Sequence, residues 1–369
     1  MTRLKLGMVG GGQGAFIGAV HRIAARIDGR FDLVAGALSS DPARAAASAA
    51  ELGIERSYDS YDAMAVAEAA RDDGIDAVAI VTPNHMHAGP AIAFLKAGIH
   101  VICDKPLAAT AEDAAAIQAA VAISKARFFL THNYTGYPLI RQAREMVANG
   151  DLGNIRIIQA EYAQDWLTEA VGSSNKQAEW RTDPARAGAG CIGDIGTHAF
   201  NIATFVTGMV PNVLSAELSS FVSGRQVDDN AFIRLRYQNG ARGIIWSSLL
   251  AVGCENGLKL RVDGDKRGLE WNQENPNQMT FARFGEPKQI ITRGGAGLGS
   301  DAGRWTRIPP GHPEGYLEGF ANLYNDIADI ISGKIDNGLV PDLSAGVDGM
   351  WFITSCIDSS NANGSWIKR

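Results

Sequence analysis

The chain has 369 residues, 46% hydrophobic and 20% charged, a composition typical of a globular protein and a length that predicts two domains. Its net charge of −6 and pI near 5.7 argue against nucleic acid or an anionic membrane surface as a partner. No apolar run approaches membrane-spanning length, the first residues do not resemble a signal peptide, and the four cysteines have no paired spacing. We therefore expect a cytoplasmic protein without a disulfide framework.

The first residues predict a strand, a glycine-rich turn and a helix. Apolar residues 4–9 indicate a buried strand, residues 10–18 read Gly-Gly-Gly-Gln-Gly-Ala-Phe-Ile-Gly, and residues 19–27 have a helical pattern. Glycines in this context permit a tight turn and let backbone amides approach a pyrophosphate at the start of the helix. The motif can be counted as Gly10-x-Gly12-x-x-Ala15, or with its last glycine displaced to Gly18. A flexible surface loop is the alternative.

The second predicted strand, 31–38, bears on the choice of cofactor. It ends at Ser39, Ser40 and Asp41, with Arg44 beyond. An acidic residue at this strand end would bind the ribose 2′-hydroxyl of NAD, whereas a serine with a nearby arginine could equally receive a 2′-phosphate. NAD is the cofactor expected, and NADP stays open on these residues.

Apolar runs and helical patterns then alternate up to residue 131. The expected helices are 42–52, 62–72, 90–97 and 111–124, and the expected strands are 77–81, 100–103 and 128–131. This alternation predicts an α/β domain with a parallel, doubly wound sheet. Thr82, Pro83 and Asn84 follow one strand and are expected beside the cofactor. His85 and His87 lack metal-ligating partners at a supporting spacing, so we expect loop and helix-cap roles and no metal site.

Lys105 directly follows the apolar run 97–103, with Asp104 before it and Pro106 after it. Ligands bind at the carboxyl ends of parallel strands in such sheets. A lysine that is desolvated there and flanked by charge can exchange protons with a ligand. A strand-end lysine that simply extends into solvent is the alternative.

The pattern changes after residue 150. The expected strands are 155–163, 213–221, 229–237, 241–250, 258–262, 268–272 and 279–284, and Asn239-Gly240 is typical of a hairpin. Many strands with short connections predict a largely antiparallel sheet, and their alternation is only half apolar. We therefore expect a homo-oligomer, a dimer or a tetramer, formed through the open face of this sheet.

Residues 186–201 combine several glycines with Asp194 and His198, followed by a helical pattern through residue 206. Four residues apart on a helix, these two side chains would share a face and could handle a proton as a pair. An aspartate that only caps a helix and a histidine with a structural role are the alternative.

The glycine-rich first turn, Asp104-Lys105-Pro106 and Gly193-Asp194-x-Gly196-x-His198 together resemble the Gfo/Idh/MocA family, named after glucose-fructose oxidoreductase, inositol dehydrogenase and a rhizopine catabolism protein. The resemblance spans the whole chain, but the family usually has Glu-Lys-Pro, and the glycine loop here is longer. It implies a Rossmann domain over 1–131 and a substrate-binding and oligomerisation α+β domain with an open, predominantly antiparallel sheet over 132–369. It also allows the last helices of the chain to pack against the first domain.

The resemblance implies that Lys105 and His198 flank the reacting carbinol, while Asp194 holds the substrate or orients the histidine. The residues expected to contact the cofactor are Gly10, Gly12, Gln13, Gly14, Ala15, Phe16, Ile17, Ser39, Ser40, Arg44, Thr82, Pro83, Asn84, His87, Asp104 and Lys105. The residues expected to contact the substrate are Lys105, Asn133, Tyr134, Tyr137, Trp166, Arg181, Asp194, His198 and His312. Trp180 belongs with them, because aromatic faces and an arginine suit a polyhydroxylated ring. Core or interface roles are the alternative for these aromatic residues.

These residues predict NAD(P)-dependent oxidation of a secondary alcohol of a cyclitol or sugar, an inositol or an aldopyranose, because such chemistry needs a hydride acceptor and a base. His312 lies in a long connection, 294–316, that we expect to cap a substrate site, in its own or a neighbouring subunit. Two other functions use the same fold. One is an NAD-dependent glycosidase with redox-cycled cleavage, and the other is a non-catalytic regulator that senses NAD(P).

Overall fold

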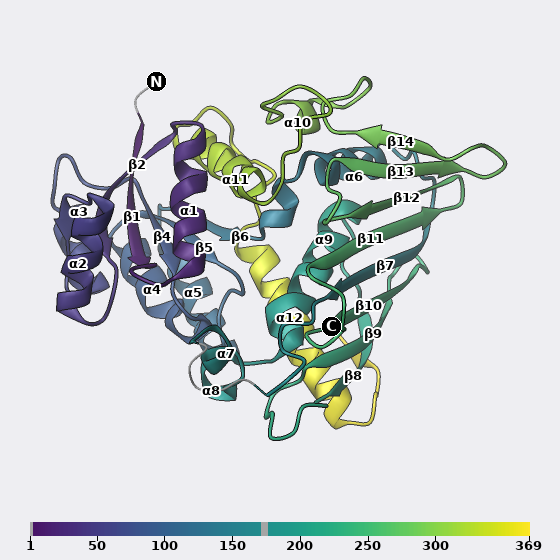
Figure 1. Cartoon of the computed structure of the whole chain (residues 1–369), viewed down its shortest axis with the longest axis horizontal. Helices are drawn as coiled ribbons and strands as arrows, with labels where there is room; N and C mark the ends of the chain where they lie inside the picture. Colours follow the sequence, from purple (N-terminus) through teal and green to yellow (C-terminus); the bar gives the residue numbers. More distant parts are fainter. Residues whose placement is uncertain (1–2, 171–175) are drawn as a thin grey trace. The chain divides into compact units, whose positions relative to one another are not determined.

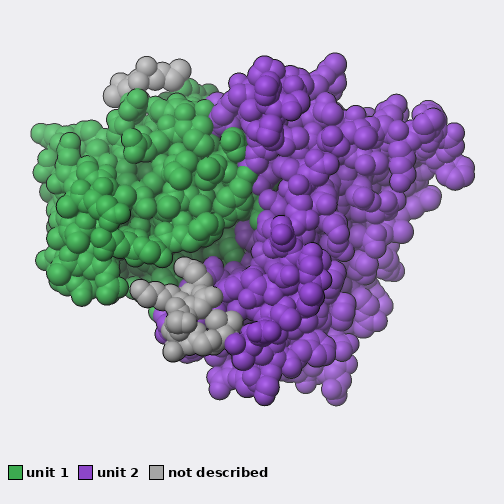
Figure 2. Space-filling model, viewed as in Figure 1, with its two compact units in different colours: residues 1–136, 316–347 green, residues 137–315, 348–369 purple. Residues whose placement is uncertain are grey.

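A computed structural model describes residues 3–170 and 176–369 of the chain (Figure 1). These residues form two compact units, shown in separate colours in Figure 2. Unit 1 comprises 1–136 and 316–347, and unit 2 comprises 137–315 and 348–369. The chain therefore returns to unit 1 after it has formed most of unit 2. Our prediction that two separately folding domains meet between residues 131 and 132 stays a prediction.

Unit 1 contains a six-stranded sheet in which every pairing is parallel, so the predicted doubly wound sheet is confirmed. The order is β3-β2-β1-β4-β5-β6, with the first strand of the chain near the middle. β4 and most of β5 are buried, as expected of central strands that are uniformly apolar. The strands are β1 Leu4–Gly10, β2 Phe31–Ala37, β3 Arg56–Ser57, β4 Ala77–Val81, β5 His100–Asp104 and β6 Phe128–Thr131.

A side-chain cap, a glycine and charged residues set the ends of helices in unit 1. Asp41 caps α2 by accepting the Arg44 N–H, and Gly53 ends it at φ +65°. α3 stops at Ala69, three residues earlier than predicted, because Asp72 and Asp73 would place negative charge at a helix C-terminus. The helices are α1 Phe16–Ile27, α2 Pro42–Leu52, α3 Tyr61–Ala69, α4 Ala88–Lys96, α5 Ala111–Ile123 and α11 Tyr316–Ile331, with 3₁₀ turns at Asn84–Met86 and Asn133–Gly136.

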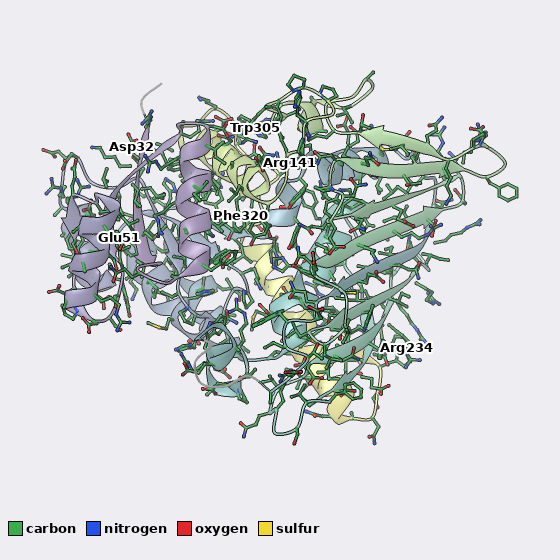
Figure 3. The ribbon with its side chains drawn as sticks, in the orientation of Figure 1. Asp32, Glu51, Arg141, Arg234, Trp305 and Phe320 are labelled. Atoms are coloured by element: carbon green, nitrogen blue, oxygen red, sulfur yellow. The ribbon has the colours of Figure 1, made fainter. Side chains whose placement is uncertain are left out.

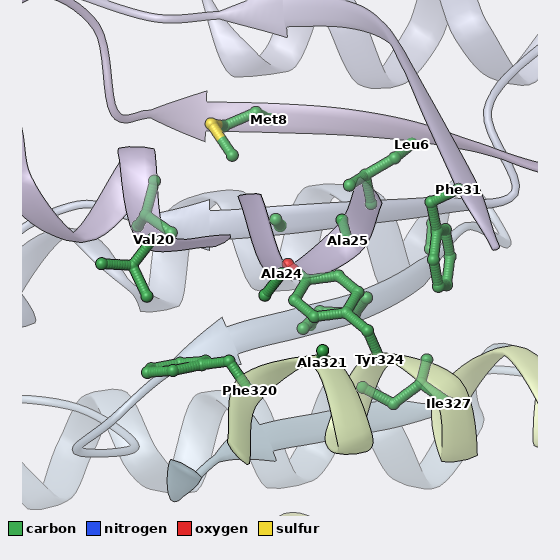
Figure 4. Packing of buried hydrophobic residues seen from close by; sticks show 14 of the residues in the cluster. Leu6, Met8, Val20, Ala24, Ala25, Phe31, Phe320, Ala321, Tyr324 and Ile327 are labelled. Atoms are coloured by element: carbon green, nitrogen blue, oxygen red, sulfur yellow. The ribbon is translucent and has the colours of Figure 1, made fainter. Parts of the chain in front are cut away.

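The core of unit 1 is completed by α11, which comes from the second stretch of chain (Figure 4). Phe320 and Tyr324 on α11 pack against the small residues Ala24 and Ala25 on α1, and Phe31 meets the Tyr324 ring edge-on at 5.4 Å. Alanines on α1 let the two helices approach closely, which buries the large aromatic side chains of α11. The Rossmann sheet is therefore covered by a helix that is distant in sequence.

Unit 2 contains a nine-stranded sheet in the order β14-β13-β12-β11-β7-β10-β9-β8-β15. Only the β7–β10 pairing is parallel, so the predicted, predominantly antiparallel sheet is confirmed. The hairpin at Asn239-Gly240 joins β9 to β10, with Gly240 at φ +91°. The strands are β7 Ile155–Ala163, β8 Val213–Ser219, β9 Asn230–Arg236, β10 Arg242–Ser248, β11 Gly257–Gly264, β12 Arg267–Asn272, β13 Gln278–Arg283, β14 Gln289–Thr292 and β15 Ile367–Lys368.

Helices cover one face of this sheet. α9 packs on β7 and β11, and Phe200 of α9 stacks on Phe352 of α12 with ring centroids 4.4 Å apart. Strands such as β9 alternate between buried and exposed residues, which leaves the other face to solvent. The helices are α6 Pro138–Ala148, α7 Lys176–Arg181, α8 Pro184–Ala187, α9 Thr197–Thr207, α10 Ser300–Gly303 and α12 Leu343–Asn361, which begins in unit 1, and a π-helix spans Ile192–Gly196.

The prediction missed the shortest elements. β14 is a four-residue, mostly exposed edge strand, and β15 has only two residues, so neither carries a periodic apolar signal. α7, α8 and α10 are also shorter than two turns. Within the ranges that the structure describes, no helix combines the length and apolar character needed to cross a membrane.

Candidate active site

Lys105 follows the last residue of β5, the strand end where the sequence pattern placed it, and its side chain is partly exposed. Its neighbour Asp104 accepts a hydrogen bond from the Thr131 hydroxyl at 2.9 Å, and Asp104 Oδ1 lies 3.7 Å from His21 Nε2. Burial raises the pKa of Asp104, but the nearby His21 ring, the Lys105 charge and the Thr131 hydrogen bond outweigh it and lower that pKa. The carboxylate beside Lys105 is therefore ionised near neutral pH.

His132 also belongs to this strand end, although no sequence pattern indicated it. It follows β6 and is 2% exposed. Burial and the positive charge of Lys105 lower the pKa of His132 to about 3, and the opposing charge of Asp104 does not compensate. A neutral imidazole therefore faces a lysine and an aspartate within unit 1.

The strand end after β4 is tied to the Lys105 loop by His87. Its Nδ1 lies 2.9 Å from the Pro106 carbonyl oxygen, and its Nε2 lies 3.0 Å from the Thr82 carbonyl oxygen. The side chain is fully buried and ties the two loops together, and His87 also stands at the N-cap position of α4, without a side-chain cap bond, in line with the expected loop and helix-cap role. Its contact with the cofactor stays a prediction. Thr82 and Pro83 are partly exposed at the same strand end, and Asn84 is buried.

The glycine-rich loop is built for close backbone approach. Gly10 ends β1 at φ +78°, and a Cβ there would come within 2.9 Å of Thr82 Cγ2. A Cβ on Gly18 would overlap the Cα of Gly11, so α1 and the loop can pack only if both are glycine. Gly14, at φ +76°, has open space where its Cβ would be. The loop therefore packs tightly against the protein at Gly10 and Gly18, whereas there is open space beside Gly14 at its tip.

α2 anchors the tip of this loop. Ser48 Oγ accepts a hydrogen bond from the Gln13 backbone N–H at 3.1 Å, and Glu51 accepts one from the Gln13 side chain at 2.8 Å. Glu51 lies on α2, where it is labelled in Figure 3. A cavity of about 300 Å³ is lined by this part of the loop, by Arg22 and by α2. Ser48 and Glu51 could not be predicted, because a serine and a glutamate on an alanine-rich helix carry no distinguishing signal.

In unit 2, the segment with Asp194 is a π-helix, not the α-helix that we predicted. The Thr197 N–H bonds to the Ile192 carbonyl five residues back, and α9 then carries His198 in its first turn. Asp194 Oδ2 lies 3.2 Å from Arg181 Nε, and the Arg181 guanidinium covers the Trp180 ring at 4.3 Å. His198 is 8% exposed and meets the Tyr162 ring edge-on. π turns of this kind are frequent at functional sites.

Asp228 fixes the start of this π-helix. Its carboxylate accepts the Gly190 N–H and the Ile192 N–H, each at 2.8 Å, and its carbonyl oxygen accepts the Cys191 N–H. A Cβ on Gly190 would overlap the Asp228 carbonyl oxygen, so only glycine permits this contact. Burial raises the pKa of Asp228, although the hydrogen bonds from Ile192, Cys191 and Gly190 oppose that shift. No sequence pattern linked Asp228 to the Asp194 segment.

The predicted substrate residues differ in exposure. Tyr137 is 2% exposed, packs edge-on against Trp271 at 5.4 Å and lies 3.4 Å from Gln273 Nε2, which are the surroundings of a core residue. Its contact with the substrate stays a prediction. Asn133 and Tyr134 are also buried, in unit 1. Trp166 is 38% exposed and donates to Gln164 at 3.1 Å, which leaves its ring accessible.

His312 is exposed in the connection between β14 and α11. This connection is ordered by a buried ion pair: Arg293 Nη1 lies 3.7 Å from Glu314 Oε1, and both side chains are 2% exposed. Arg293 also donates to the carbonyl oxygen of His312, and Glu314 accepts the backbone N–H groups of Arg307 and Ile308. The imidazole of His312 is therefore presented from a fixed backbone.

The sequence matches two family models. Residues 4–132 match the oxidoreductase family with an NAD-binding Rossmann fold, and residues 140–270 match the GFO/IDH/MocA C-terminal domain. The uncharacterized oxidoreductase YfiI of Bacillus subtilis (strain 168) is 35% identical over 99% of this chain and 96% of its own length. The chain belongs to the Gfo/Idh/MocA oxidoreductase family.

Solved structures place this Gfo/Idh/MocA oxidoreductase among close relatives. An oxidoreductase from Sinorhizobium meliloti is 52% identical, with a TM-score of 0.92 over 100% of both chains. An inositol dehydrogenase homolog from Azotobacter vinelandii, complexed with NADH and myo-inositol, is 36% identical, with a TM-score of 0.92 over 100% of this chain and 98% of the other.

The residues of the first unit fit NAD. α1 begins without a side-chain cap and without an acidic residue in its first turn, so its amide groups and positive dipole end can receive a pyrophosphate. Ala15, Phe16 and Ile17 form this helix start, and Gly12 and Gly14 precede it. Among residues 3–170 and 176–369, no group of three or more His, Cys, Asp and Glu side chains is arranged to hold a metal ion.

Proposed function

We propose that this oxidoreductase oxidises a secondary alcohol of a cyclitol, of the inositol type, with NAD as the hydride acceptor. The observation that carries the proposal is Lys105 at the end of β5, between an ionised Asp104 and a neutral, buried His132. A relative that shares 36% of its residues is described with NADH and myo-inositol, which supports a cyclitol over an aldopyranose. An aldopyranose remains the second substrate class to test.

Bound NAD supplies the group that accepts the hydride from the carbinol carbon. In the proposed reaction, Lys105 acts as its free amine and removes the hydroxyl proton through Nζ. In reverse, its ammonium returns that proton to the alkoxide. His198 shares in handling this proton, and Asp194 accepts hydrogen bonds from the substrate or orients His198. The Arg181–Asp194 pair supports this role because the guanidinium, 3.2 Å away, holds the carboxylate in position.

Arg181, Trp166 and His312 are the proposed contacts to other hydroxyl groups of the substrate. Their partial or full exposure supports this role, whereas Asn133, Tyr134 and Tyr137 act from the core by packing. If His312 caps the substrate, His312→Ala raises the substrate KM about fivefold and leaves kcat within twofold, because one exposed hydrogen bond is lost. An unchanged KM would remove His312 from the site.

We assign the cofactor preference to the end of β2. Ser39 Oγ accepts the Asp41 N–H at 3.1 Å, and the Asp41 carboxylate is held beside it by the Arg44 N–H. This negative charge disfavours a 2′-phosphate. We expect kcat/KM to be at least about tenfold higher with NAD than with NADP, the factor that 1.4 kcal/mol gives.

A spectrophotometric screen tests the function. Inositol isomers, aldopyranoses and sugar acids are each incubated with NAD and with NADP, and NADH is followed at 340 nm, the ordinary assay for this chemistry. NADH formed in proportion to an inositol supports the proposal. Released aglycone without net NADH would indicate a redox-cycled glycosidase, and NAD binding without turnover of any compound would indicate a regulator.

The open face of the nine-stranded sheet is the proposed interface of a dimer or tetramer. Ile157, Phe232 and Ile244, on three adjacent strands, are each about half exposed there. Burying such side chains between copies is favourable. Light scattering after size exclusion measures the mass, and Phe232→Glu should shift it towards the 39.2 kDa monomer.

A further inference from the structure

A buried polar connection leads from α11 to the residue beside Lys105. Tyr324 on α11 places its hydroxyl 2.9 Å from His21 Nδ1, and His21 on α1 places Nε2 3.7 Å from Asp104 Oδ1. Thr131 on β6 donates to the same oxygen of Asp104 at 2.9 Å. Four elements of unit 1 therefore converge on the carboxylate that precedes the proposed catalytic lysine.

The histidine and the tyrosine are held rigidly. His21 is 0% exposed and Tyr324 is 1% exposed. Phe320 packs against the His21 ring at 5.0 Å, and the Tyr324 ring meets it edge-on at 5.8 Å. A polar ring inside an apolar core is costly unless its nitrogens have partners. Tyr324 meets that requirement at Nδ1, whereas Nε2 lies 3.7 Å from the Asp104 carboxylate and makes no direct hydrogen bond to it.

The protons of this connection can be assigned from its chemistry. Burial, and then the charge of Asp104, raises the pKa of Tyr324, so the phenol keeps its proton and donates to His21 Nδ1. Because Nδ1 accepts from the phenol, the ring hydrogen that faces Asp104 is on Nε2. That N–H faces the Asp104 carboxylate at a distance longer than a direct hydrogen bond, so it acts on Asp104 as an oriented dipole.

We propose that His21 and Tyr324 are positioning residues for Lys105, which act through Asp104. The proposal rests on the role proposed above for Lys105. The His21 N–H orients the Asp104 carboxylate and disperses part of its negative charge. Asp104 therefore attracts the Lys105 ammonium less strongly.

Other titratable groups surround the same carboxylate and must be followed together with it. Asp104 interacts electrostatically with Lys105, His132, His87, Cys103 and Tyr324. Because several groups couple here, a change in the pH dependence of activity alone does not identify which group has changed. The test therefore needs a signal from Lys105 itself.

The experiment compares wild type with three variants. His21→Leu removes both ring nitrogens, His21→Gln keeps an N–H near the Nε2 position, and Tyr324→Phe removes only the phenol. Competitive acetylation of each NAD-free protein with acetic anhydride, from pH 6 to pH 11, is read out for Lys105 by peptide mass spectrometry. Exposed Lys96 in the same unit is the internal reference. The kcat and KM for myo-inositol and NAD are measured over the same variants.

We expect the pH midpoint of Lys105 acetylation to rise by about 0.5 to 1 unit in His21→Leu and by about half as much in Tyr324→Phe, with Lys96 unchanged. His21→Gln should restore most of the wild-type midpoint. The acid limb of the kcat profile should move in parallel, which lowers kcat about threefold to tenfold at pH 7, while the KM for NAD stays within twofold.

A wild-type midpoint in His21→Leu overturns the proposal, and so does a midpoint in His21→Gln that matches His21→Leu, since both would leave only a packing role. If His21→Leu fails to fold, a wild-type midpoint in Tyr324→Phe overturns it instead. Lys105→Ala separates this inference from the proposed function. Full turnover in that variant would overturn the role of the lysine in catalysis, whereas the acetylation midpoints still decide whether His21 acts on Lys105.

Discussion

The two units hold their proposed catalytic residues by different means. Lys105 in unit 1 stands at the end of a regular, buried strand, and its neighbours are fixed by an ordinary parallel sheet. Asp194 in unit 2 stands in a π-helix that depends on one glycine and on Asp228. The first arrangement is robust, because the whole sheet determines it. The second arrangement depends on a few backbone contacts, so a single substitution should disturb the position of Asp194 more.

The largest effect should come from removing the proton-handling group without disturbing the sheet. Lys105→Ala should lower kcat by about 10³-fold, within the range for loss of a general base. NAD affinity, measured by calorimetry, and the melting temperature should stay close to wild type, because the side chain is partly exposed. A large loss of stability would contradict the view that the strand end is robust.

The next largest effect should come from unit 2. In Gly190→Ala, the new methyl group would overlap the Asp228 carbonyl oxygen, so the segment must move at a cost of about 3 kcal/mol. We expect a lower melting temperature and at least a tenfold loss of kcat, with NAD still bound. Gly303→Ala is the matched control, because its Cβ would meet nothing within 4 Å and its φ is not positive. Equal behaviour of the two variants would contradict the role of this contact.

Asp228→Asn tests the same contact with a smaller structural change. An amide can accept only one of the two N–H groups that the carboxylate now accepts, so one hydrogen bond is lost at a cost of about 1 to 3 kcal/mol. We expect kcat to fall several-fold and the KM for NAD to stay unchanged, as measured by steady-state kinetics. Wild-type kcat would show that the π-helix does not depend on this side chain.

The smallest effect concerns the stability of unit 1 in acid. The pKa of His132 is about 3 in the folded protein and near 6.5 when unfolded, so only the unfolded chain takes up this proton between those values. The contribution is complete above pH 6.5 and is lost as the pH falls towards 3, at up to about 1.4 kcal/mol per unit. His132→Gln should reduce the slope of the unfolding free energy between pH 6.5 and 5, measured in urea. The same change at exposed His85 should leave the slope unaltered.

Features that depend on a local residue pattern could be predicted from the sequence. The parallel sheet followed from alternating runs, and Lys105 was placed correctly because an apolar run that stops at a charged pair indicates a strand end. The bounds of β4, β6, β7 and α2 were predicted without error. The strand end that carries Lys105 was therefore accessible to spacing rules.

The missed residues are those whose partners are distant along the chain. His21 contacts Tyr324 across 303 residues, and Asp228 bonds to Ile192 across 36, and no periodicity signals such pairs. The π-helix was missed because Asp194 and His198 have the same spacing in either kind of helix, and Asp228 decides between them. The burial of Tyr137 was not foreseen because it depends on Trp271, on a strand far along the sequence.

The place of α11 in unit 1 has a consequence for how the protein is made. The ribosome releases residues 1–136 first, but Phe320 and Tyr324, which cover Ala24 and Ala25, follow only after roughly 180 further residues, about 10 to 40 s later at ordinary rates of synthesis. During that interval the apolar face of α1 has no permanent cover. The nascent dinucleotide-binding fold must therefore be shielded by another part of the chain or by a chaperone until its last helix arrives.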